Sequence, residues 1–475
     1  MQVMKFGGGC LKRPADVMRI ARIVSRNPGP QAVVVSAVHG VTDRLERAVE
    51  SALGEDGKAD PILDGFAEIH HAFARAAAPD RTSESELLRR LDRGIRSVRN
   101  LCRRLPQAPD GAAQLVPRIL SHGERSSAHL LSAALNGIGR RARAMESEEI
   151  GLLTDQNLFN ATVQLKRSEE PLRRCLEAVI SRGVIPVITG FYGHTEDGKI
   201  SLLGRNGTDY SAAVIARALG ADTLVLWKDV RGFMSADPAL VPEARLLRRL
   251  TFREAAELSY FGAHVIHPRT LEPLAGRSTS ITIRSVHRPR YGGTRIWPAA
   301  NGDIGLIKSV TYNRDICVLR VRGPGVGYQP GVISRIGRVL VREGINIYSI
   351  LTAQTCINLL LHARDGDHAL RALRVVRGGA VDGVDLRTDL ALIAVVGEGI
   401  LERQGLAAAV FTAVSRAKVN VEMISTGASP VASYFIVRRD DMIGAVQAIH
   451  QDLLSGGPCQ ERTSRESWRI RNAAT

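Results

Sequence analysis

Short apolar runs alternate with amphipathic helical stretches over the first 290 residues of this 475-residue chain. The runs "QVMKF", "AVVVSAV", "VIPVITGF", "DTLVLW" and "ITIRS" have the length and composition of buried strands. Between them, stretches such as "PADVMRIARIVSR" and "TDYSAAVIARALG" place apolar residues three and four positions apart, which is typical of helices. Strands separated by helices require a mostly parallel sheet that is covered on both faces. The sequence therefore predicts an α/β sandwich.

Two segments depart from this alternation. Residues 60–140 contain Arg- and Leu-rich helical patterns and no convincing strand, so they predict a helical excursion from the sheet. The segment "HRPRYGGTRIWPAANGD" (287–303) is rich in Pro and Gly and has no period. We therefore expect the first domain to end near residue 300.

The last third of the chain contains an internal repeat with a period of 74 residues. "GVISRIGRVLVREGINIYSI" (331–350) and "GLAAAVFTAVSRAKVNVEMI" (405–424) superpose without gaps. Each copy predicts a helix, an Asn-containing turn and a strand, and each follows a strand-like run, "DICVLRVRG" or "LALIAVVGE". A unit of this size cannot bury both faces of its sheet alone. We therefore expect the copies to pair with each other or with another subunit.

Composition excludes several classes of protein. The formal charge is +16, but the arginines are scattered, aromatic residues make up only 4%, and no basic run alternates with stacking residues, so nucleic-acid binding is not indicated. An anionic small substrate fits this charge equally well. No 18-residue apolar run or secretion signal appears, which predicts a cytoplasmic protein that does not span a membrane. The six cysteines lie far apart, which predicts reduced thiols and no metal site: Cys10, Cys102, Cys175, Cys317, Cys356 and Cys459.

Four glycine-bearing turns follow apolar runs in the first domain. They are "KFGGG" (5–9), "SAVHGVTD" (36–43), "GFYG" (190–193) and "LLGRNGTDY" (202–210). Lys5 precedes its glycines, so the first turn is not a Walker loop. Such loops gather at the carboxyl ends of parallel strands, where glycines allow close approach to phosphate oxygens. Each turn alone is common in α/β proteins, but their combination with "SHGE" (121–124) is specific.

These motifs, in this order, resemble those of the aspartokinases in the amino-acid kinase family. "KFGGGC" is similar to the family's KFGGTS, the run ending in "GRNGTDY" to GRGGSDY, "WKDVRGFMSADPAL" to WTDVDGVYTADPR, and "FGAHVIHPRT" to FGAKVLHPRT. The repeated C-terminal units resemble paired ACT domains, which bind amino-acid effectors at their interfaces. The resemblance covers nearly the whole chain. It implies an amino-acid kinase αβα sandwich at 1–295, βαββαβ-type ACT domains at 305–388 and 389–460, and a C-terminal tail at 461–475.

The resemblance implies a phosphotransferase. Aspartokinases transfer the terminal phosphoryl group of ATP, bound with Mg²⁺, to the side-chain carboxylate of L-aspartate, the first step toward lysine, threonine and methionine. This carboxylate is already ionised at neutral pH, so no general base is needed. Catalysis then depends on aligning two anions and offsetting the charge that develops.

The resemblance also assigns roles to individual residues. Lys5 would face the transferring phosphoryl group, and Asp209 would orient Lys5 or the metal. Arg205 would bind the α-carboxylate of the substrate, and Glu124 would bind its ammonium group. The other implied substrate contacts are Thr42, Phe191 and Thr208. The implied nucleotide contacts are Gly7, Gly8, Gly9, Lys228, Asp229, Met234, Asp237, Pro238 and His264. Taken singly, Lys5, Glu124 and Arg205 are ordinary surface residues, and only the joint pattern indicates a site.

Several departures from the family pattern fall on the nucleotide side. Gly9 and Cys10 replace a Thr-Ser pair and remove two hydroxyl donors, because a thiol is a much weaker donor. Each lost charge-assisted contact costs about 1.5 to 3 kcal/mol. Two alternatives therefore stand beside an aspartokinase: a kinase with another acceptor or donor, and a catalytically weak amino-acid sensor or regulatory partner. The remaining departures are Lys228 for threonine, Met234 for tyrosine, Ala239 for arginine and His264 for lysine.

The repeated units also depart from lysine-sensitive relatives. Tyr348 lies where those relatives carry an aspartate that pairs with the effector, whereas Asn346 and Gln354 offer polar contacts. We therefore predict weak or no inhibition by lysine. Apolar edges in the repeats predict a homodimer formed through the ACT domains.

Overall fold

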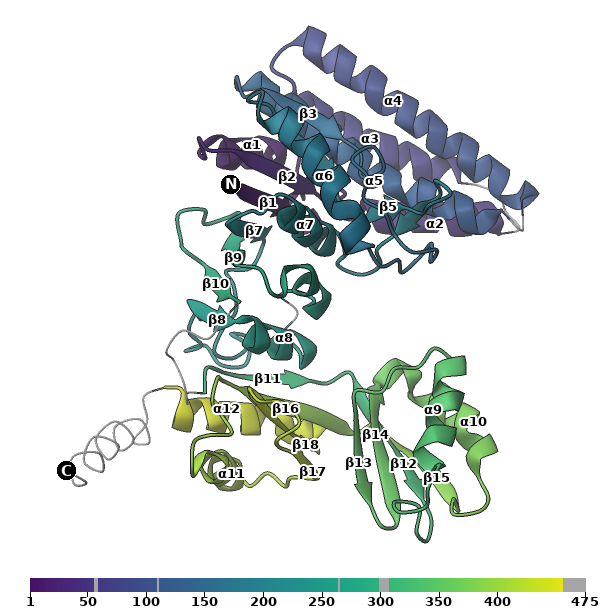
Figure 1. Ribbon diagram of the computed structural model, residues 1–475, viewed down its shortest axis with the longest axis vertical. Coiled ribbons are helices and arrows are strands. Elements are labelled where there is room, and N and C mark those ends of the chain that lie inside the picture. Colours follow the sequence, from purple (N-terminus) through teal and green to yellow (C-terminus); the bar gives the residue numbers. More distant parts are fainter. Residues whose placement is uncertain (55–58, 109–110, 264, 299–306, 456–475) are drawn as a thin grey trace, which may run out of the picture. The chain divides into compact units, whose positions relative to one another are not determined.

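The computed structural model describes residues 1–54, 59–108, 111–263, 265–298 and 307–455, which divide into two compact units (Figure 1). The first unit takes in Met1–Phe233, Leu246–Phe252 and Val265–Ala299, and the second holds the other described residues. Among the described residues, no helix is long and apolar enough to cross a membrane. Five cysteines are described, and all of them are free thiols.

The first unit is built around an eight-stranded sheet with the order β3-β4-β2-β1-β7-β9-β10-β8. Every neighbouring pair is parallel except β9 and β10. Consecutive residues are buried in β2 and β4, so side chains are covered on both faces of the sheet. The predicted α/β sandwich is therefore confirmed. The strands are β1 (Gln2–Phe6), β2 (Gln31–Val35), β3 (Ala142–Met145), β4 (Ile185–Thr189), β7 (Thr223–Lys228), β8 (Arg249–Thr251), β9 (Ser280–Ser285) and β10 (Thr294–Trp297).

Helices cover this sheet in two groups. Helices α6 (Leu165–Ile180) and α7 (Gly207–Ala218) pack on each other and against β4 and β1, respectively. The other helices gather around α5, which packs against β3 and β4: α1 (Ala15–Ser25), α2 (Val41–Leu53), α3 (Asp60–Ala77), α4 (Arg81–Arg104) and α5 (Ala112–Gly137). Helices α3 to α5 confirm the predicted helical excursion over residues 60–140. A short hairpin of β5 (Tyr192–His194) and β6 (Ile200–Leu202) lies beside them.

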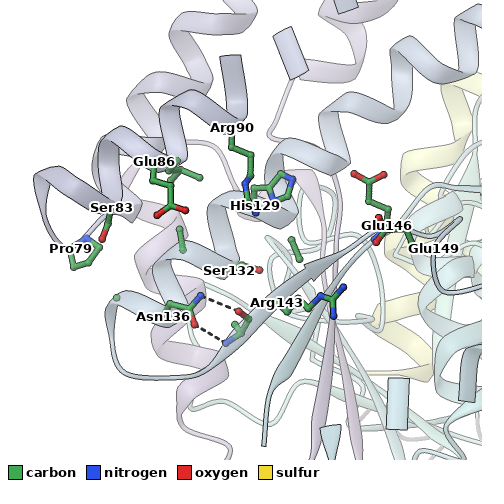
Figure 2. A pocket seen from close by; sticks show the side chains of 15 residues that line it. Pro79, Ser83, Glu86, Arg90, His129, Ser132, Asn136, Arg143, Glu146 and Glu149 are labelled. Atoms are coloured by element: carbon green, nitrogen blue, oxygen red, sulfur yellow. Dashed lines mark hydrogen bonds between the residues drawn. The ribbon is translucent and has the colours of Figure 1, made fainter. Parts of the chain in front are cut away.

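Strand β3 is an edge strand, and a side chain covers part of its free edge. The Asn136 side chain accepts a hydrogen bond from the Ala142 N–H at 2.8 Å and donates one to the Ala142 carbonyl at 3.0 Å (Figure 2). This side chain satisfies the backbone groups that a ninth strand would otherwise bind.

Part of the segment 287–303 belongs to the sheet of the first unit and does not form only a linker out of it. Its residues Thr294–Trp297 form β10, which pairs antiparallel with β9 and parallel with β8. A four-residue strand is too short to show a period, so the sequence did not reveal it. The predicted boundary near residue 300 lies outside the described residues.

The second unit contains two four-stranded antiparallel sheets. The first has the order β13-β14-β12-β15, with helices α9 (Val332–Arg342) and α10 (Gly366–Ala372). Its strands are β12 (Ile316–Arg322), β13 (Ser349–Ala353), β14 (Cys356–His362) and β15 (Gly383–Arg387). The second has the order β11-β16-β18-β17, with helices α11 (Leu406–Arg416) and α12 (Met442–Leu453). Its strands are β11 (Ser309–Asn313), β16 (Leu390–Val396), β17 (Met423–Ser425) and β18 (Ala432–Arg438).

The repeat appears in the structure as two equivalent helix starts. Gly331 precedes α9 with φ +87° and Gly405 precedes α11 with φ +79°, a left-handed conformation that favours glycine. One boundary needs correction. Strand β11 pairs with β16, so the second sheet includes residues from the predicted 305–388 domain and is interrupted by the first sheet. The repeat could not reveal this pairing, because β11 lies outside the repeated segments. The predicted tail, 461–475, lies outside the described residues.

Candidate active site

Two lysines at the ends of adjacent strands share one buried aspartate. Lys5 lies in β1, Lys228 is the last residue of the neighbouring β7, and Asp209 lies in the first turn of α7. The Lys5 Nζ is 2.7 Å from Asp209 Oδ1, and the Lys228 Nζ is 2.7 Å from Asp209 Oδ2. Lys5 is 6% exposed and Asp209 is 1% exposed. The fold thus joins residues from three separate sequence motifs in one charge cluster.

The electrostatic balance keeps Asp209 ionised. Burial alone would raise the pKa of its carboxyl group, but Lys228 and Lys5 outweigh burial and hold the pKa well below its ordinary value. Two ammonium groups then face one carboxylate, so the cluster carries an excess positive charge. The start of α7 adds positive potential at the same place. This cluster is suited to binding an anion.

The glycine turn after β1 allows close approach of the backbone to these charges. A Cβ at Gly7 would lie 3.1 Å from the Lys5 Nζ, and a Cβ at Gly9 would lie 3.1 Å from Asp229 Oδ2. A Cβ at Gly8 would lie 3.0 Å from the carbonyl oxygen of Ala37. A larger residue at position 9 would therefore displace the Asp229 carboxylate, so this glycine and the aspartate fit together.

The Cys10 thiol donates its hydrogen bond within the protein and not to a ligand. Its Sγ donates to the Trp227 carbonyl at 3.2 Å, and burial raises the pKa of the thiol to about 12. The neutral thiol thus hydrogen-bonds to the backbone near the end of β7. This contact agrees with the inference from the sequence that the turn has lost hydroxyl donors.

Glu124 presents a buried carboxylate oxygen without a partner. A Cβ at Gly123 would lie 2.7 Å from the Ala37 Cβ, so glycine lets α5 approach the turn after β2. The Ala37 N–H donates to Glu124 Oε1 at 3.0 Å, whereas Oε2 is buried and has no hydrogen-bond partner among the described residues. Burial raises the pKa of Glu124 to about 8, although the Ala37 amide acts in the opposite direction. A cationic ligand group would satisfy this oxygen.

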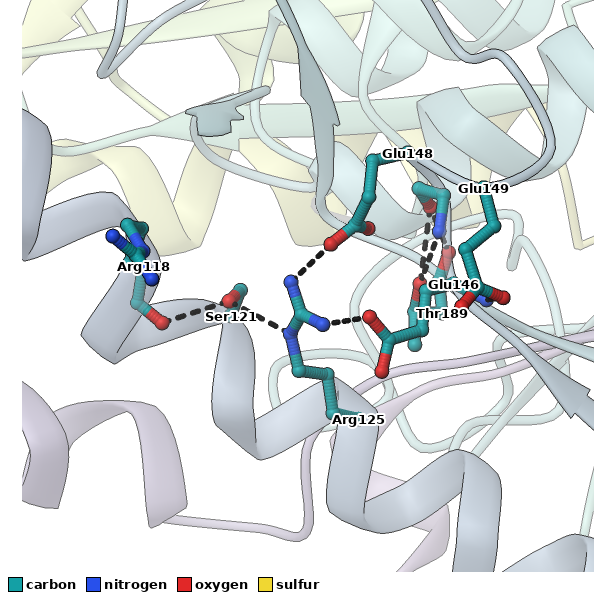
Figure 3. Close-up of polar contacts among 8 residues, drawn as sticks. Arg118, Ser121, Arg125, Glu146, Glu148, Glu149 and Thr189 are labelled. Carbon is teal, nitrogen blue, oxygen red and sulfur yellow. Dashed lines mark hydrogen bonds and ion pairs between the residues drawn. The ribbon is translucent and has the colours of Figure 1, made fainter. Parts of the chain in front are cut away.

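The next residue on α5 anchors the helix to the segment after β3. Arg125 forms ion pairs with Glu146 and Glu148, and its Nε donates to Ser121 Oγ at 3.2 Å (Figure 3). The same segment is fixed to the end of β4, because the Ser147 N–H donates to Thr189 Oγ1 at 2.9 Å. These contacts hold the part of α5 that carries Glu124. Arg125 directly follows the "SHGE" motif, but nothing local in the sequence predicts this role.

A strained pair of turns positions the other predicted substrate residues. Phe191 has φ +72° and Asn206 has φ +57°, a region that side-chain-bearing residues rarely adopt and that costs about 1 to 3 kcal/mol. A Cβ at Gly190 would lie only 2.2 Å from Thr208 Cγ2, so the two turns interlock. Thr208 is buried, whereas the neighbouring Arg205 is exposed. Strain of this kind is common at binding sites.

Arg269 holds these turns from the other side. Its guanidinium donates to the Leu203 carbonyl at 2.9 Å, to Thr162 Oγ1 at 3.1 Å and to the Ala161 carbonyl. It also lies over the Tyr210 ring, 4.3 Å from the centroid. Arg269 thus positions the turn that carries Arg205. The "HPRT" motif contains it, but nothing local in the sequence shows which backbone oxygens it binds.

Other predicted contacts lie at separate places. Asp229 pairs with Lys12 at 3.0 Å beside the glycine turn, and Thr42 is half-buried in the first turn of α2. Asp237 accepts a hydrogen bond from the Tyr312 hydroxyl at 2.7 Å in the second unit, which also contains Met234 and Pro238. His264 lies outside the described residues. The nucleotide contacts implied for Met234, Asp237, Pro238 and His264 therefore stay predictions.

The predicted effector residues lie at turns of the second unit. Asn346 precedes β13, Gln354 follows it, and both are exposed. Within the described ranges, neither side chain has a hydrogen-bond partner. The described residues also contain no group of three or more His, Cys, Asp or Glu residues that could hold a metal ion.

Comparisons with known proteins agree with this architecture. Residues 1–285 match the amino acid kinase family, and residues 393–453 match the ACT domain. The chain is 27% identical over 472 residues to the bifunctional aspartokinase/homoserine dehydrogenase of Buchnera aphidicola, covering 95% of this chain and 56% of the relative. It is 28% identical to the aspartokinase of Saccharomyces cerevisiae, covering 95% of this chain and 92% of the relative. The chain thus spans only about half the length of the bifunctional relatives it matches.

A solved structure is similar along nearly the whole chain. Escherichia coli aspartokinase III, crystallised with aspartate and ADP, has a TM-score of 0.79 and 27% identity. The match covers 96% of this chain and all of that protein. The same bacterial enzyme was also solved with lysine and aspartate, again with a TM-score of 0.79.

Proposed function

The chain belongs to the amino acid kinase family, and on that premise we propose that it transfers the terminal phosphoryl group of ATP to the side-chain carboxylate of L-aspartate. The observation that carries the proposal is the buried cluster of Lys5, Asp209 and Lys228 together with the unpartnered oxygen of Glu124. The first offers excess positive charge for phosphate, and the second offers negative charge for an ammonium group. The likeness to a bacterial aspartokinase bound to aspartate and ADP supports the same assignment.

Recognition of aspartate uses both signs of charge. Glu124 Oε2 would accept from the α-ammonium group, and this interaction offsets the cost of burying an ionised carboxylate. Arg205 is exposed at the tip of its turn, and its planar guanidinium suits the α-carboxylate. Thr208, Thr42 and Phe191 would complete the pocket around the side chain.

Phosphoryl transfer needs alignment more than acid–base chemistry. The ionised side-chain carboxylate attacks the terminal phosphorus, a carboxylate O–P bond forms, and the bond to the bridging oxygen of ATP breaks to release ADP. Lys5 stabilises the charge on the moving phosphoryl group, because its ammonium group is a compact charge on a flexible stem. Asp209 positions Lys5, and Lys228 holds the second oxygen of Asp209.

The glycine turn is the proposed phosphate-approach element, with Gly7, Gly8 and Gly9 leaving room for phosphate oxygens. Mg²⁺ bound with ATP would neutralise phosphate charge. Asp229 fits such an ion best, because it is partly exposed beside Gly9 and, among the described residues, only its Oδ2 is paired with a lysine, Lys12. Asp209 fits less well, because both of its oxygens already face lysine ammonium groups.

We also propose that the second unit regulates the enzyme by binding an amino-acid effector and that the chain is a homodimer. The ACT domain match over 393–453 supports this role. Inhibition by lysine should be weak or absent, since Tyr348 cannot supply a negative charge to a lysine ammonium group. Activity measured against lysine concentration tests this point, and strong inhibition would contradict it.

The activity is tested by two assays on the same sample. Release of ADP should depend on L-aspartate, and hydroxylamine should trap the acyl phosphate as a hydroxamate. Lys5→Ala should reduce both rates by at least 100-fold, because it removes the charge facing the phosphoryl group. If hydroxamate formed only with another amino acid, that amino acid would be the acceptor in place of aspartate. Aspartate binding without turnover would instead indicate an amino-acid sensor.

A further inference from the structure

A cavity opens along the free edge of β3 in the first unit. This β3-edge cavity has a volume of about 600 Å³ and lies between α4, α5, β3 and the turn that follows β3 (Figure 2). Its size is within the range of small-molecule sites. None of the residues assigned above to phosphate or aspartate lines it. The cavity is therefore separate from the candidate active site.

The floor of the cavity offers one open backbone position. Residues alternate along a strand, and Arg141 directs its carbonyl to Ile185, the first residue of β4. Ala142 therefore directs its N–H and carbonyl away from β4, where Asn136 binds both. By the same alternation, Ala144 directs its N–H and carbonyl toward the free edge, and Ala144 lines the cavity. A ligand with one donor and one acceptor can bind there.

This arrangement favours a small ligand over an added strand. A new strand would need the backbone groups of Ala142 as well as those of Ala144, but the Asn136 side chain already occupies the former. Only one residue-length of backbone remains available. The occupant should therefore be no longer than one or two amino-acid residues.

A buried hydroxyl without a partner lies in the wall of the cavity. Ser132 is 7% exposed, and its Oγ has no hydrogen-bond partner among the described residues. One turn earlier on α5, His129 also lines the cavity, and burial, with Arg90 nearby, lowers the pKa of its imidazole to about 4. A neutral imidazole and a free hydroxyl can each donate to or accept from a polar ligand.

Charges of both signs surround these groups. Arg90 and Glu86 come from α4, Arg143 comes from β3, and Glu149 follows β3 (Figure 2). Within the described ranges, Arg90, Arg143 and Glu86 form no ion pair with the protein. Glu146 also lines the cavity but is already paired with Arg125. Among the described residues, the cavity walls thus carry unpaired cations and an unpaired anion.

We propose that the β3-edge cavity binds the zwitterion of an α-amino acid, either as a free amino acid or as a dipeptide. The carboxylate of the ligand binds Arg143 and Arg90, and its ammonium group faces Glu86 on α4. The backbone groups of Ala144 and the hydroxyl of Ser132 bind the remaining polar atoms. This site is additional to the aspartate site and to the second unit, and it does not depend on the proposed function.

The proposal is tested by calorimetric titration of the full chain with each of the nineteen amino acids other than aspartate and with Gly-Gly and Ala-Ala. Saturating L-aspartate and ADP are present to fill the candidate active site. At least one probe should bind, and Arg143→Glu should weaken that binding at least tenfold, since it reverses an exposed charge at the cavity. Glu86→Lys should do the same from the opposite wall. Arg174→Glu, an exposed arginine on α6 outside the cavity, is the matched control and should leave binding unchanged.

Hydrogen exchange of the same samples locates the ligand. The peptide that contains Ala144 should exchange more slowly with the bound probe, because the probe covers its N–H. If single amino acids protect this peptide, the site binds free amino acids. If only Gly-Gly or Ala-Ala protects it, the site binds dipeptides. Absence of binding by every probe would overturn the proposal. The proposal would also be overturned if no bound probe protected the Ala144 peptide, or if both charge reversals left that protection unchanged.

Discussion

Glu124→Gln should remove the pH dependence of aspartate use between pH 6.5 and pH 8. Burial raises the pKa of Glu124 to about 8, so the free enzyme holds this residue mostly neutral at pH 6.5. The ammonium group of aspartate binds the ionised form, and kcat/KM reports the ionisation of the free enzyme. A pKa of about 8 leaves roughly 3% of Glu124 ionised at pH 6.5 and about half at pH 8. The value of kcat/KM for aspartate should therefore rise about 15-fold over this interval.

Glu124→Gln should lack this rise in kcat/KM. Glutamine keeps the acceptor for the Ala37 N–H but carries no charge, so kcat/KM should be nearly flat over the same pH range. At pH 8.5 the variant should be about 10- to 100-fold poorer than the wild type, because a hydrogen bond to a charged group contributes about 1.5 to 3 kcal/mol. Glu50→Gln, on the exposed face of α2, is the control and should retain the wild-type profile. A wild-type profile without this rise, or parallel profiles for wild type and Glu124→Gln, would refute the reasoning.

Stability gives a second readout that does not depend on activity. Folding raises the pKa of Glu124 from near 4.5 to about 8, so the folded protein resists ionising this group. The resulting destabilisation is absent below pH 4.5, grows as the pH rises, and is complete above pH 8. Chemical unfolding should therefore show that Glu124→Gln gains stability relative to the wild type as the pH rises from 5 to 8. A constant difference would show that Glu124 is not desolvated.

Three further predictions address the rest of the site. Asp209→Asn should lower the free energy of unfolding by about 3 to 5 kcal/mol, because two buried ammonium groups lose their counter-ion. Adding Lys228→Met should recover part of this loss, and strictly additive effects in denaturant titrations would contradict the shared ion pair. Gly190→Ala should destabilise the protein by about 1 to 3 kcal/mol, since its Cβ would overlap Thr208. Gly292→Ala is the control, because its Cβ would meet open space, and equal melting temperatures for the two variants would disprove the overlap. Arg269→Lys should raise KM for aspartate about tenfold with little change in kcat, because lysine cannot bind several carbonyls of the turn at once, and a loss confined to kcat would exclude this positioning role.

The sequence predicted the long elements better than the short ones. Strands β1, β2, β4, β7 and β9 have five or six residues each, enough for an apolar run to be visible. Strands β3, β8 and β10 have three or four residues and carry no such signal. Their pairing depends on neighbours supplied by the rest of the sheet.

The candidate site shows the same division. Motifs identified Lys5, Glu124 and Asp209 as candidates, because each lies in a recognisable sequence motif. Nothing in those motifs indicated that Lys228 would bind the second oxygen of Asp209. Arg125 and Arg269 were also missed, since their partners are backbone and carboxylate oxygens brought from distant segments.

The sequence by itself determined the parallel sheet, the helical excursion and the repeated units, because the spacing of apolar side chains is a local property of the chain. Only the tertiary structure decided which charges neutralise each other, which carboxylate oxygen of Glu124 stays free, and which sheet receives β11. Those outcomes depend on distances between residues far apart in sequence. Ion pairs, desolvation and strand pairing act through such distances, so they are fixed only once the chain has packed.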